Sequence, residues 1–188
     1  MPQRLQIFMV LGLVTLLAAC MGPAVDPGPD PARVVVSVER TLTGRQVREA
    51  MSQGGPFPGS RVRLDNFLGP FWELSVQQKQ PDGSWRRLPT APDQPSLPDG
   101  YKFDVRRVFL APPGAQELRL RLAAYINRSW EEQVGDPYVY RRTKDGEVYR
   151  DYQPNWRSQS ATIYISDLQR IRKVDLKAGR ELVLEPFK

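Results

Sequence analysis

The sequence predicts an all-β protein, an antiparallel β-sandwich with one short helix near residues 44–53. Apolar and polar residues alternate with a period of two along most of the chain, as in strands that bury one face. Turn-forming combinations of Pro, Gly, Asn and Asp separate these runs. With 40% hydrophobic and 26% charged residues, the 188-residue chain has the composition of one globular domain with appendages.

The alternation is clearest where Leu118, Leu120 and Leu122 are separated by Arg119 and Arg121. Such a run has one apolar and one charged face, so it predicts a strand at the surface of a core. The expected strands, in chain order, cover residues 34–38, 62–65, 72–76, 85–88, 101–105, 118–126, 138–142, 147–152, 161–165, 174–176 and 181–184.

Three turn sequences predict hairpins: Pro81-Asp82-Gly83-Ser84, Lys144-Asp145-Gly146 and Lys177-Ala178-Gly179, the last joining the final two strands. The Pro-rich segment 88–100 predicts a long loop that crosses from one sheet to the other. The alternation changes phase at residues 106–107, which predicts a β-bulge there.

Helical signals are few. Thr43 and Gln46 have capping-box spacing, and apolar residues follow at i, i+3 and i+4 from Val47, so residues 44–53 should form a short amphipathic helix. A second helical turn is expected over residues 167–171.

The stretch 97–122, with Pro112-Pro113-Gly114-Ala115 linking two strands, resembles immunoglobulin-like and jelly-roll binding modules. The resemblance implies a sandwich of that general kind and assigns the domain to no family.

The first 19 residues predict a secretory signal peptide. Arg4 is their only charge, and an apolar run follows from Leu5 to Ala19. At about 1.5 Å per residue this run is shorter than the roughly 30 Å hydrocarbon core of a bilayer, which favours an export signal over a spanning helix.

The run ends in Leu17-Ala18-Ala19-Cys20, which resembles the lipobox of bacterial lipoproteins. The resemblance implies cleavage before Cys20, a diacylglycerol on its thiol and usually a third acyl chain on its new amino group. Because Asp at the next position commonly marks inner-membrane retention, Met21 implies the outer membrane in a diderm organism. The alternative is an ordinary signal peptide followed by an unrelated Cys.

Three segments follow from these patterns: a signal peptide (1–19), a lipidated Cys with a Pro-rich linker (20–32) and one β-sandwich domain (33–188). Two or three acyl chains would hold the protein on a membrane almost permanently. The linker is expected to act as an extended spacer between bilayer and domain.

The composition argues against enzymes. The chain has no His, which excludes Ser-His-Asp triads, Cys-His pairs and imidazole metal ligands. Glu131 and Glu132 are adjacent, so on a strand they would point to opposite sides and make a poor glycosidase pair. We therefore expect no catalytic activity, cofactor or metal, and no nucleic-acid partner for an exported, anchored protein.

Aromatic and arginine residues are interleaved between residues 125 and 164. On a hairpin, tyrosines can stack on sugar rings or pack in an interface while arginines bind carboxylates or phosphates. The candidate ligand-binding residues are Tyr138, Tyr140, Arg141, Arg142, Tyr149, Tyr152 and Trp156. The alternative is that these pairs only stabilise the hairpin.

Together these observations predict a lipid-anchored cell-envelope protein whose non-catalytic sandwich has a structural or accessory role. Its partners would be the membrane, through the lipid, and another envelope protein. The alternative is a module that binds cell-wall glycan through the aromatic and arginine residues of the hairpin.

Overall fold

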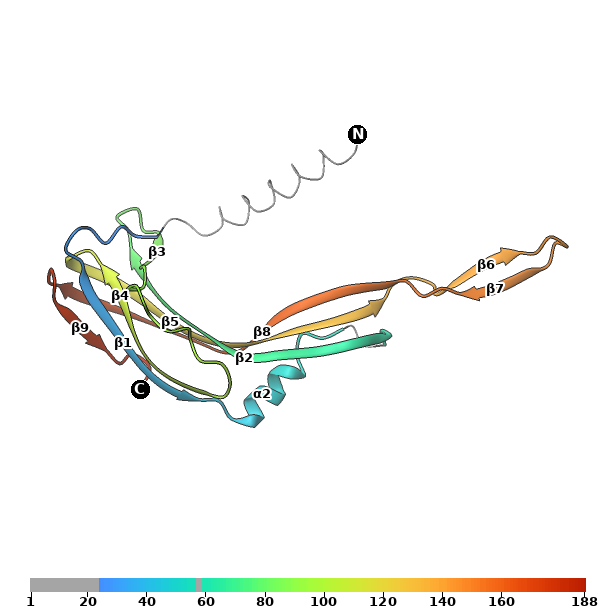
Figure 1. Ribbon diagram of the computed structural model, residues 1–188, viewed down its shortest axis with the longest axis horizontal. Helices are drawn as coiled ribbons and strands as arrows, with labels where there is room; N and C mark the ends of the chain where they lie inside the picture. The colour runs from blue at the N-terminus through green and yellow to red at the C-terminus, as the bar shows by residue number, and fades with distance from the viewer. Residues whose placement is uncertain (1–23, 57–58) are drawn as a thin grey trace, which may run out of the picture.

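Two β-sheets face each other at one end of the molecule, and three strands of one sheet run on into a long arm (Figure 1). The computed structural model describes residues 24–56 and 59–188. The signal peptide, the cleavage motif at Leu17, Ala18 and Ala19, Cys20 and Met21 lie outside the described residues.

The smaller sheet has the strand order β4-β1-β9. Its strands are β1 (Ala32–Thr41), β4 (Lys102–Ala111) and β9 (Glu181–Leu184). β1 pairs antiparallel with β4 and parallel with β9.

The larger sheet has the order β3-β2-β5-β8, with antiparallel pairing throughout. Its strands are β2 (Val62–Lys79), β3 (Trp85–Arg87), β5 (Gly114–Gln133) and β8 (Trp156–Leu176). The chain passes from this sheet to the smaller one between β3 and β4, along the Pro-rich loop, as expected. The prediction of an all-β, sandwich-like fold with one short helix is confirmed.

The core lies between the two sheets. Val34, Val36 and Leu120 are completely buried in it, and alternation along β1 and β5 directs these side chains inward. The rings of Trp72 and Phe103 bridge the sheets with their centroids 4.8 Å apart. Each fully buried side chain of this size contributes about 1.5–3 kcal/mol, so the core supplies most of the stabilisation.

The helix α2 (Gly44–Met51) begins at the predicted capping box. The Gln46 amide donates to Thr43 Oγ1 at 3.3 Å, and the Thr43 amide donates to Gln46 Oε1 at 2.9 Å. Val47 and Ala50 are buried. The cap and the apolar spacing were therefore sufficient to predict this element.

Two expectations near the C-terminus were wrong. Residues 167–171 lie within strand β8, where they pair with β5, because the neighbouring strand imposes an extended backbone on a sequence of mixed propensity. The turn at Lys177 leads to no hairpin, because β9 leaves the sheet of β8 and pairs parallel with β1.

The bulge expected at residues 106–107 is also absent. β1 and β4 pair without a register shift from Ala32↔Ala111 to Thr41↔Lys102. Arg107 simply occupies an inward position between Val105 and Phe109, with its guanidinium reaching the Pro95 carbonyl at 3.3 Å. A long arginine stem can cover apolar surface while its charged end stays at the rim.

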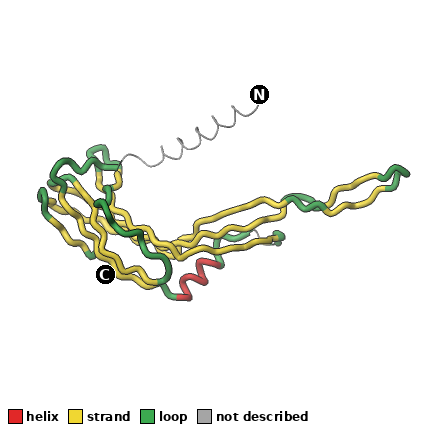
Figure 2. Tube along the Cα trace, viewed as in Figure 1, coloured by secondary structure: helices red, strands yellow, loops and turns green. Residues whose placement is uncertain are grey.

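Three strands are longer than predicted. β2, β5 and β8 have 18, 20 and 21 residues. β2 and β8 each join runs that were predicted as separate strands, and β5 extends the single predicted run 118–126 at both ends. Their outer parts, residues 62–71, 125–133 and 156–164, form the arm (Figures 1 and 2). At about 3.3 Å per residue the arm extends about 30 Å beyond the sandwich. Register shifts lie at Arg63/Asn66, Leu68/Phe71 and Ala124/Tyr125.

The two faces of the arm differ at its root. On one face, Ala50 of α2 packs on Ile126 and Ile163 in a second small core. On the other face, Phe71, Tyr125 and Tyr164 form a row across three strands, with centroid separations of 5.7 and 6.0 Å. The helix therefore braces one side of the arm and leaves the aromatic row open, with Tyr164 exposed.

Within residues 24–56 and 59–188, no helix is both long and apolar enough to cross a membrane.

Candidate functional site

A separate two-stranded hairpin continues the arm at its far end (Figure 1). This terminal hairpin comprises β6 (Tyr138–Arg142), β7 (Val148–Tyr152) and the turn between them. In the turn, the Gly146 amide donates to the Thr143 carbonyl at 3.1 Å and the Glu147 amide to Thr143 Oγ1 at 3.1 Å. The predicted Lys144-Asp145-Gly146 hairpin is confirmed.

The terminal hairpin is almost entirely exposed. Every residue of β6 and β7 is exposed except the half-buried Asp151. Tyr140 is 62% exposed and Val148 59%. No described element covers either face, so apolar and aromatic surface faces the solvent at this end of the molecule.

The strand register divides the hairpin into two faces. The cationic face carries six side chains, which are Tyr138, Tyr140, Arg142, Val148, Arg150 and Tyr152. The opposite face carries Val139, Arg141, Tyr149 and Asp151. Tyrosines and arginines are thus present on both sides, but only the opposite face has a carboxylate.

Stacking organises the cationic face. Tyr138 and Tyr152 are a cross-strand pair with centroids 5.6 Å apart and ring planes at 66°. The Arg150 guanidinium lies 4.1 Å from the centroid of Tyr138 and 5.9 Å from that of Tyr140. These contacts hold Arg150 against the aromatic surface and stabilise the hairpin through cation–π attraction.

On the opposite face, charges are already paired. Arg141 Nε lies 3.1 Å from Asp151 Oδ2, and Gln153 Nε2 donates to the same carboxylate oxygen at 2.8 Å. An exposed pair of this kind contributes little to stability, but it neutralises this side of the hairpin.

A cavity of about 450 Å³ lies where the arm meets the hairpin. We call it the junction cavity, and its lining residues are Gly59, Ser60, Arg61, Gln133, Asp136, Pro137, Tyr138 and Arg150. Gln133 Oε1 is shielded from solvent and has no hydrogen-bond partner among the described residues. The cavity therefore continues the cationic face and adds Arg61 to the two arginines already there, Arg142 and Arg150.

The structure brings together only part of the predicted set. Tyr138, Tyr140, Arg142 and Tyr152 share the cationic face, whereas Arg141 and Tyr149 lie on the opposite face. Trp156 is not in the hairpin: it opens β8, pairs with Gln133 and lies under the Arg63 guanidinium at 4.5 Å.

Sequence reasoning missed Arg150, Arg61 and Gln133 as members of this surface. For Arg150 a signal was present, because a hairpin turning at Lys144-Asp145-Gly146 with Arg142 opposite Val148 places Arg150 opposite Tyr140. For Arg61 and Gln133 no local signal exists, since their positions depend on the long pairing of β2 with β5.

Two bidentate ion pairs fix the strands that carry the hairpin. Arg128 in β5 donates to both carboxylate oxygens of Asp65 in β2, at 2.9 and 2.8 Å. These hydrogen bonds lower the pKa of Asp65 below its ordinary value and raise that of Arg128. The Arg128 guanidinium also lies 4.8 Å from the Phe67 ring and contacts the Gln53 carbonyl at 3.4 Å, so it ties the loop after α2 to the arm.

The second pair joins β5 to β8 at the root of the arm. Arg121 donates to Asp167 from Nε at 2.8 Å and from Nη2 at 3.0 Å. These hydrogen bonds lower the pKa of Asp167 and raise that of Arg121. Arg121 also lies 5.3 Å from the Tyr164 ring.

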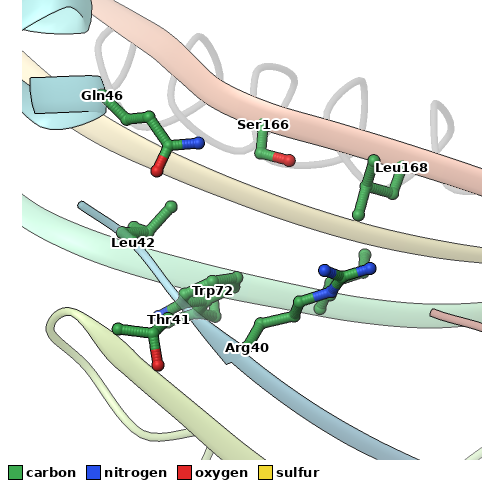
Figure 3. A pocket seen from close by; sticks show the side chains of 8 residues that line it. Arg40, Thr41, Leu42, Gln46, Trp72, Ser166 and Leu168 are labelled. Carbon is green, nitrogen blue, oxygen red and sulfur yellow. The ribbon is translucent and has the colours of Figure 1, made fainter. Parts of the chain in front are cut away.

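A second cavity, of about 230 Å³, opens at the mouth of the sandwich (Figure 3). Its lining residues are Arg40, Thr41, Leu42, Gln46, Trp72, Leu122, Ser166 and Leu168. In Figure 3 Arg40 and Leu168 lie at one end and Gln46 at the other. The Gln46 side chain is already used in the helix cap, and the lining residues Leu42, Trp72 and Leu122 belong to the core.

Comparison of the chain with protein-family models, with curated proteins and with solved structures gave no match.

Proposed function

We propose that this protein is a non-catalytic accessory protein of the cell envelope that is anchored by lipid on Cys20. Its terminal hairpin docks on another envelope protein. The single observation that supports the proposal is the position and exposure of the hairpin. It lies at the end of an arm, away from the core, and no described element covers it.

An isolated two-stranded hairpin is marginally stable in water. The terminal hairpin nevertheless exposes Tyr138, Tyr140, Tyr149 and Tyr152 together with two valines. Interfaces between proteins are enriched in Tyr and Arg, and a few such residues carry most of the binding free energy. A surface of this kind fits a partner that covers the hairpin.

The position of residues 24–31 is compatible with a membrane anchor close to the sandwich. The Val25 amide donates to the Arg87 carbonyl at 3.0 Å, and the Val25 side chain packs against the sandwich core. Residues 24–31 thus lie against the sandwich, at the end of the molecule remote from the hairpin (Figure 1). A lipid at Cys20 would keep the sandwich near the membrane and leave the hairpin free to reach a partner.

The anchor is tested by intact mass spectrometry of the native protein and by the Cys20→Ser variant. We expect a diacylglyceryl group on Cys20, and release of Cys20→Ser from membranes. An unmodified thiol in the native protein would refute this part of the proposal.

The docking role is tested in the cells that make the protein, with a photo-cross-linking amino acid in place of Tyr140. The control places the same cross-linker at Val183, which is 52% exposed on the sandwich. We expect a discrete protein adduct from position 140 and none from position 183. Equal labelling from both positions, or none from either, would count against docking through the hairpin.

A variant without the hairpin provides a second readout. The Gln153 amide donates to the Pro137 carbonyl at 2.6 Å, so the two ends are adjacent and a two-residue Asn-Gly turn can replace residues 138–152. We expect the melting temperature of the shortened protein to lie within about 2 °C of that of the full chain, because the core is untouched. We also expect the shortened protein to lose the accessory function.

A glycan-binding module is the second candidate, favoured by the exposure of Tyr140, whose ring could stack on a sugar. It is tested by sedimentation of the protein with purified cell-wall polysaccharide. Binding that Tyr140→Ser abolishes would favour this candidate over protein docking.

A further inference from the structure

We propose that the cationic face and the junction cavity together bind an acidic segment of the partner protein. This inference rests on the proposed docking function and adds to it the chemistry of the partner and the side of the hairpin that it contacts. The opposite face, with its neutralised ion pair, is assigned no direct role.

Arg150 is held by stacking while its hydrogen-bond donors stay unused. Its guanidinium is stacked on Tyr138 and Tyr140, yet it makes no hydrogen bond or ion pair with any residue in 24–56 or 59–188. Stacking uses the plane of a guanidinium and leaves the N–H groups at its edge free to donate. Arg150 is therefore held in place with its donors unused, ready for a forked acceptor such as a carboxylate.

Positive charge predominates on the cationic face and in the junction cavity. Arg142 and Arg150 are the only charged residues among the six side chains of the cationic face. Arg61 adds a third positive charge in the junction cavity. The one carboxylate in the cavity lining, Asp136, accepts the Tyr138 amide at 2.9 Å. Three arginines against one carboxylate leave this surface with a net positive charge, which is complementary to a partner with several carboxylates.

The geometry of the cationic face suits a protein better than an acidic glycan. Tyr138 and Tyr152 meet at 66°, so they form no flat platform for sugar rings, and Arg150 already covers the Tyr138 ring at 4.1 Å. What remains open is a mixed surface of ring edges, a valine and arginine donors. Apolar and acidic side chains alternating along a peptide fit such a surface better than a polysaccharide chain does.

The volume of the junction cavity limits how much of the acidic segment it can hold. About 450 Å³ beside Arg61, Gln133 and Arg150 is enough for one acidic side chain and its backbone. We therefore place one end of the acidic segment in the junction cavity and the rest along the cationic face.

The experiment places the photo-cross-linking amino acid at position 140 of the full-length chain, in the cells that make it, and combines it with matched charge variants. Arg150→Gln removes a charge from the cationic face, and Arg141→Gln removes one from the opposite face of the same hairpin. Both residues are exposed, so neither change disturbs a core. Arg150→Lys keeps the charge but loses the forked donor.

We expect the cross-linked peptide, identified by mass spectrometry, to come from a segment rich in Asp and Glu. Arg150→Gln should lower the adduct yield about ten-fold, Arg150→Lys by less, and Arg141→Gln by less than about two-fold. Raising the salt concentration should weaken binding of the corresponding synthetic peptide to the purified protein.

The outcomes separate the two proposals. A protein adduct at a neutral or basic segment, or one equally sensitive to Arg141→Gln and Arg150→Gln, overturns this inference and leaves docking through the hairpin intact. An adduct to polysaccharide overturns it in favour of a glycan. If no adduct forms from position 140, the docking function itself is wrong, and this inference falls with it.

Discussion

Arg128 in β5 and Asp65 in β2 form a two-pronged clamp, with Nε to Oδ1 at 2.9 Å and Nη2 to Oδ2 at 2.8 Å. The same guanidinium reaches the Gln53 carbonyl, so one side chain connects two strands of the arm with the loop that follows α2. Residues 62–71, 125–133 and 156–164 contribute nothing to the main core, so this ion pair joins the strands in a region that core burial does not stabilise.

Replacing Arg128 by Gln should therefore loosen the arm and the loop together. The Arg128 side chain is only 11% exposed, but Asp65 is 34% exposed and can regain water, so we expect a loss of about 1 kcal/mol, or about 3 °C in melting temperature. Calorimetry measures this loss, and hydrogen exchange of residues 62–68 should accelerate. Arg157→Gln, on an exposed position of β8, serves as the control. An equal effect of both substitutions would show that the clamp contributes nothing specific.

The two clamped carboxylates should give the protein a defined acid sensitivity. The pKa values of Asp65 and Asp167 lie below the ordinary 3.8, chiefly because of hydrogen bonds from Arg128 and Arg121. A lowered folded-state pKa means that the stabilisation is complete above pH 3.8 and disappears as the pH falls through the lower folded value. The stabilities of the wild type and of Asp65→Asn should thus differ at pH 7, and the difference should shrink as the pH falls through the lowered folded-state pKa of Asp65. Urea titrations across this range measure the difference, and a gap that persists at low pH would contradict the assignment.

The core should respond strongly to a cavity. Leu120 is completely buried between the sheets, so Leu120→Ala should cost about 2–5 kcal/mol. Ile171, the next position along the β5–β8 ladder, faces outward and is 55% exposed, so Ile171→Ala should cost less than about 1 kcal/mol. Chemical denaturation of the two variants makes the comparison. Similar losses would mean that the outer face of the large sheet is covered in the intact protein.

The helix cap offers a local test. Thr43→Ala removes the Oγ1 acceptor of the Gln46 amide and should destabilise α2 by about 1 kcal/mol, while Thr43→Ser should retain the cap. Hydrogen exchange at Val47 and Ala50 reports on the helix directly. Since Ala50 packs on Ile126 and Ile163, we also expect faster exchange at these two arm positions, and their insensitivity would show that the helix does not brace the arm.

Local patterns in the sequence were enough to predict the sandwich and the helix. Alternation marks a strand wherever one face is buried, as at Leu118, Leu120 and Leu122, and the Thr43–Gln46 cap is a local signal. The full length of the arm was not predictable in this way, because most residues on both of its faces are exposed or half-buried and include Ser, Thr, Asn and Arg without strict alternation. There, pairing with neighbouring strands determines the backbone.

The candidate site was predictable as a hairpin but not as a surface. The turn at Lys144-Asp145-Gly146 and the tyrosines beside it were visible in the sequence. The division into two faces required the register, and Arg61 and Gln133 required the pairing of β2 with β5. The partition of β9 into the other sheet likewise depends on a contact with β1 across most of the chain's length.

The residue-by-residue pairing of β2, β5 and β8 also restricts how this protein can change over evolutionary time. An insertion in one strand alone would force a new bulge or turn every later side chain to the wrong side. A longer or shorter arm would need matched insertions or deletions, two residues at a time, in three distant parts of the gene. Related chains should therefore vary freely in the turn between β6 and β7 but conserve the length of the arm between the sandwich and the terminal hairpin.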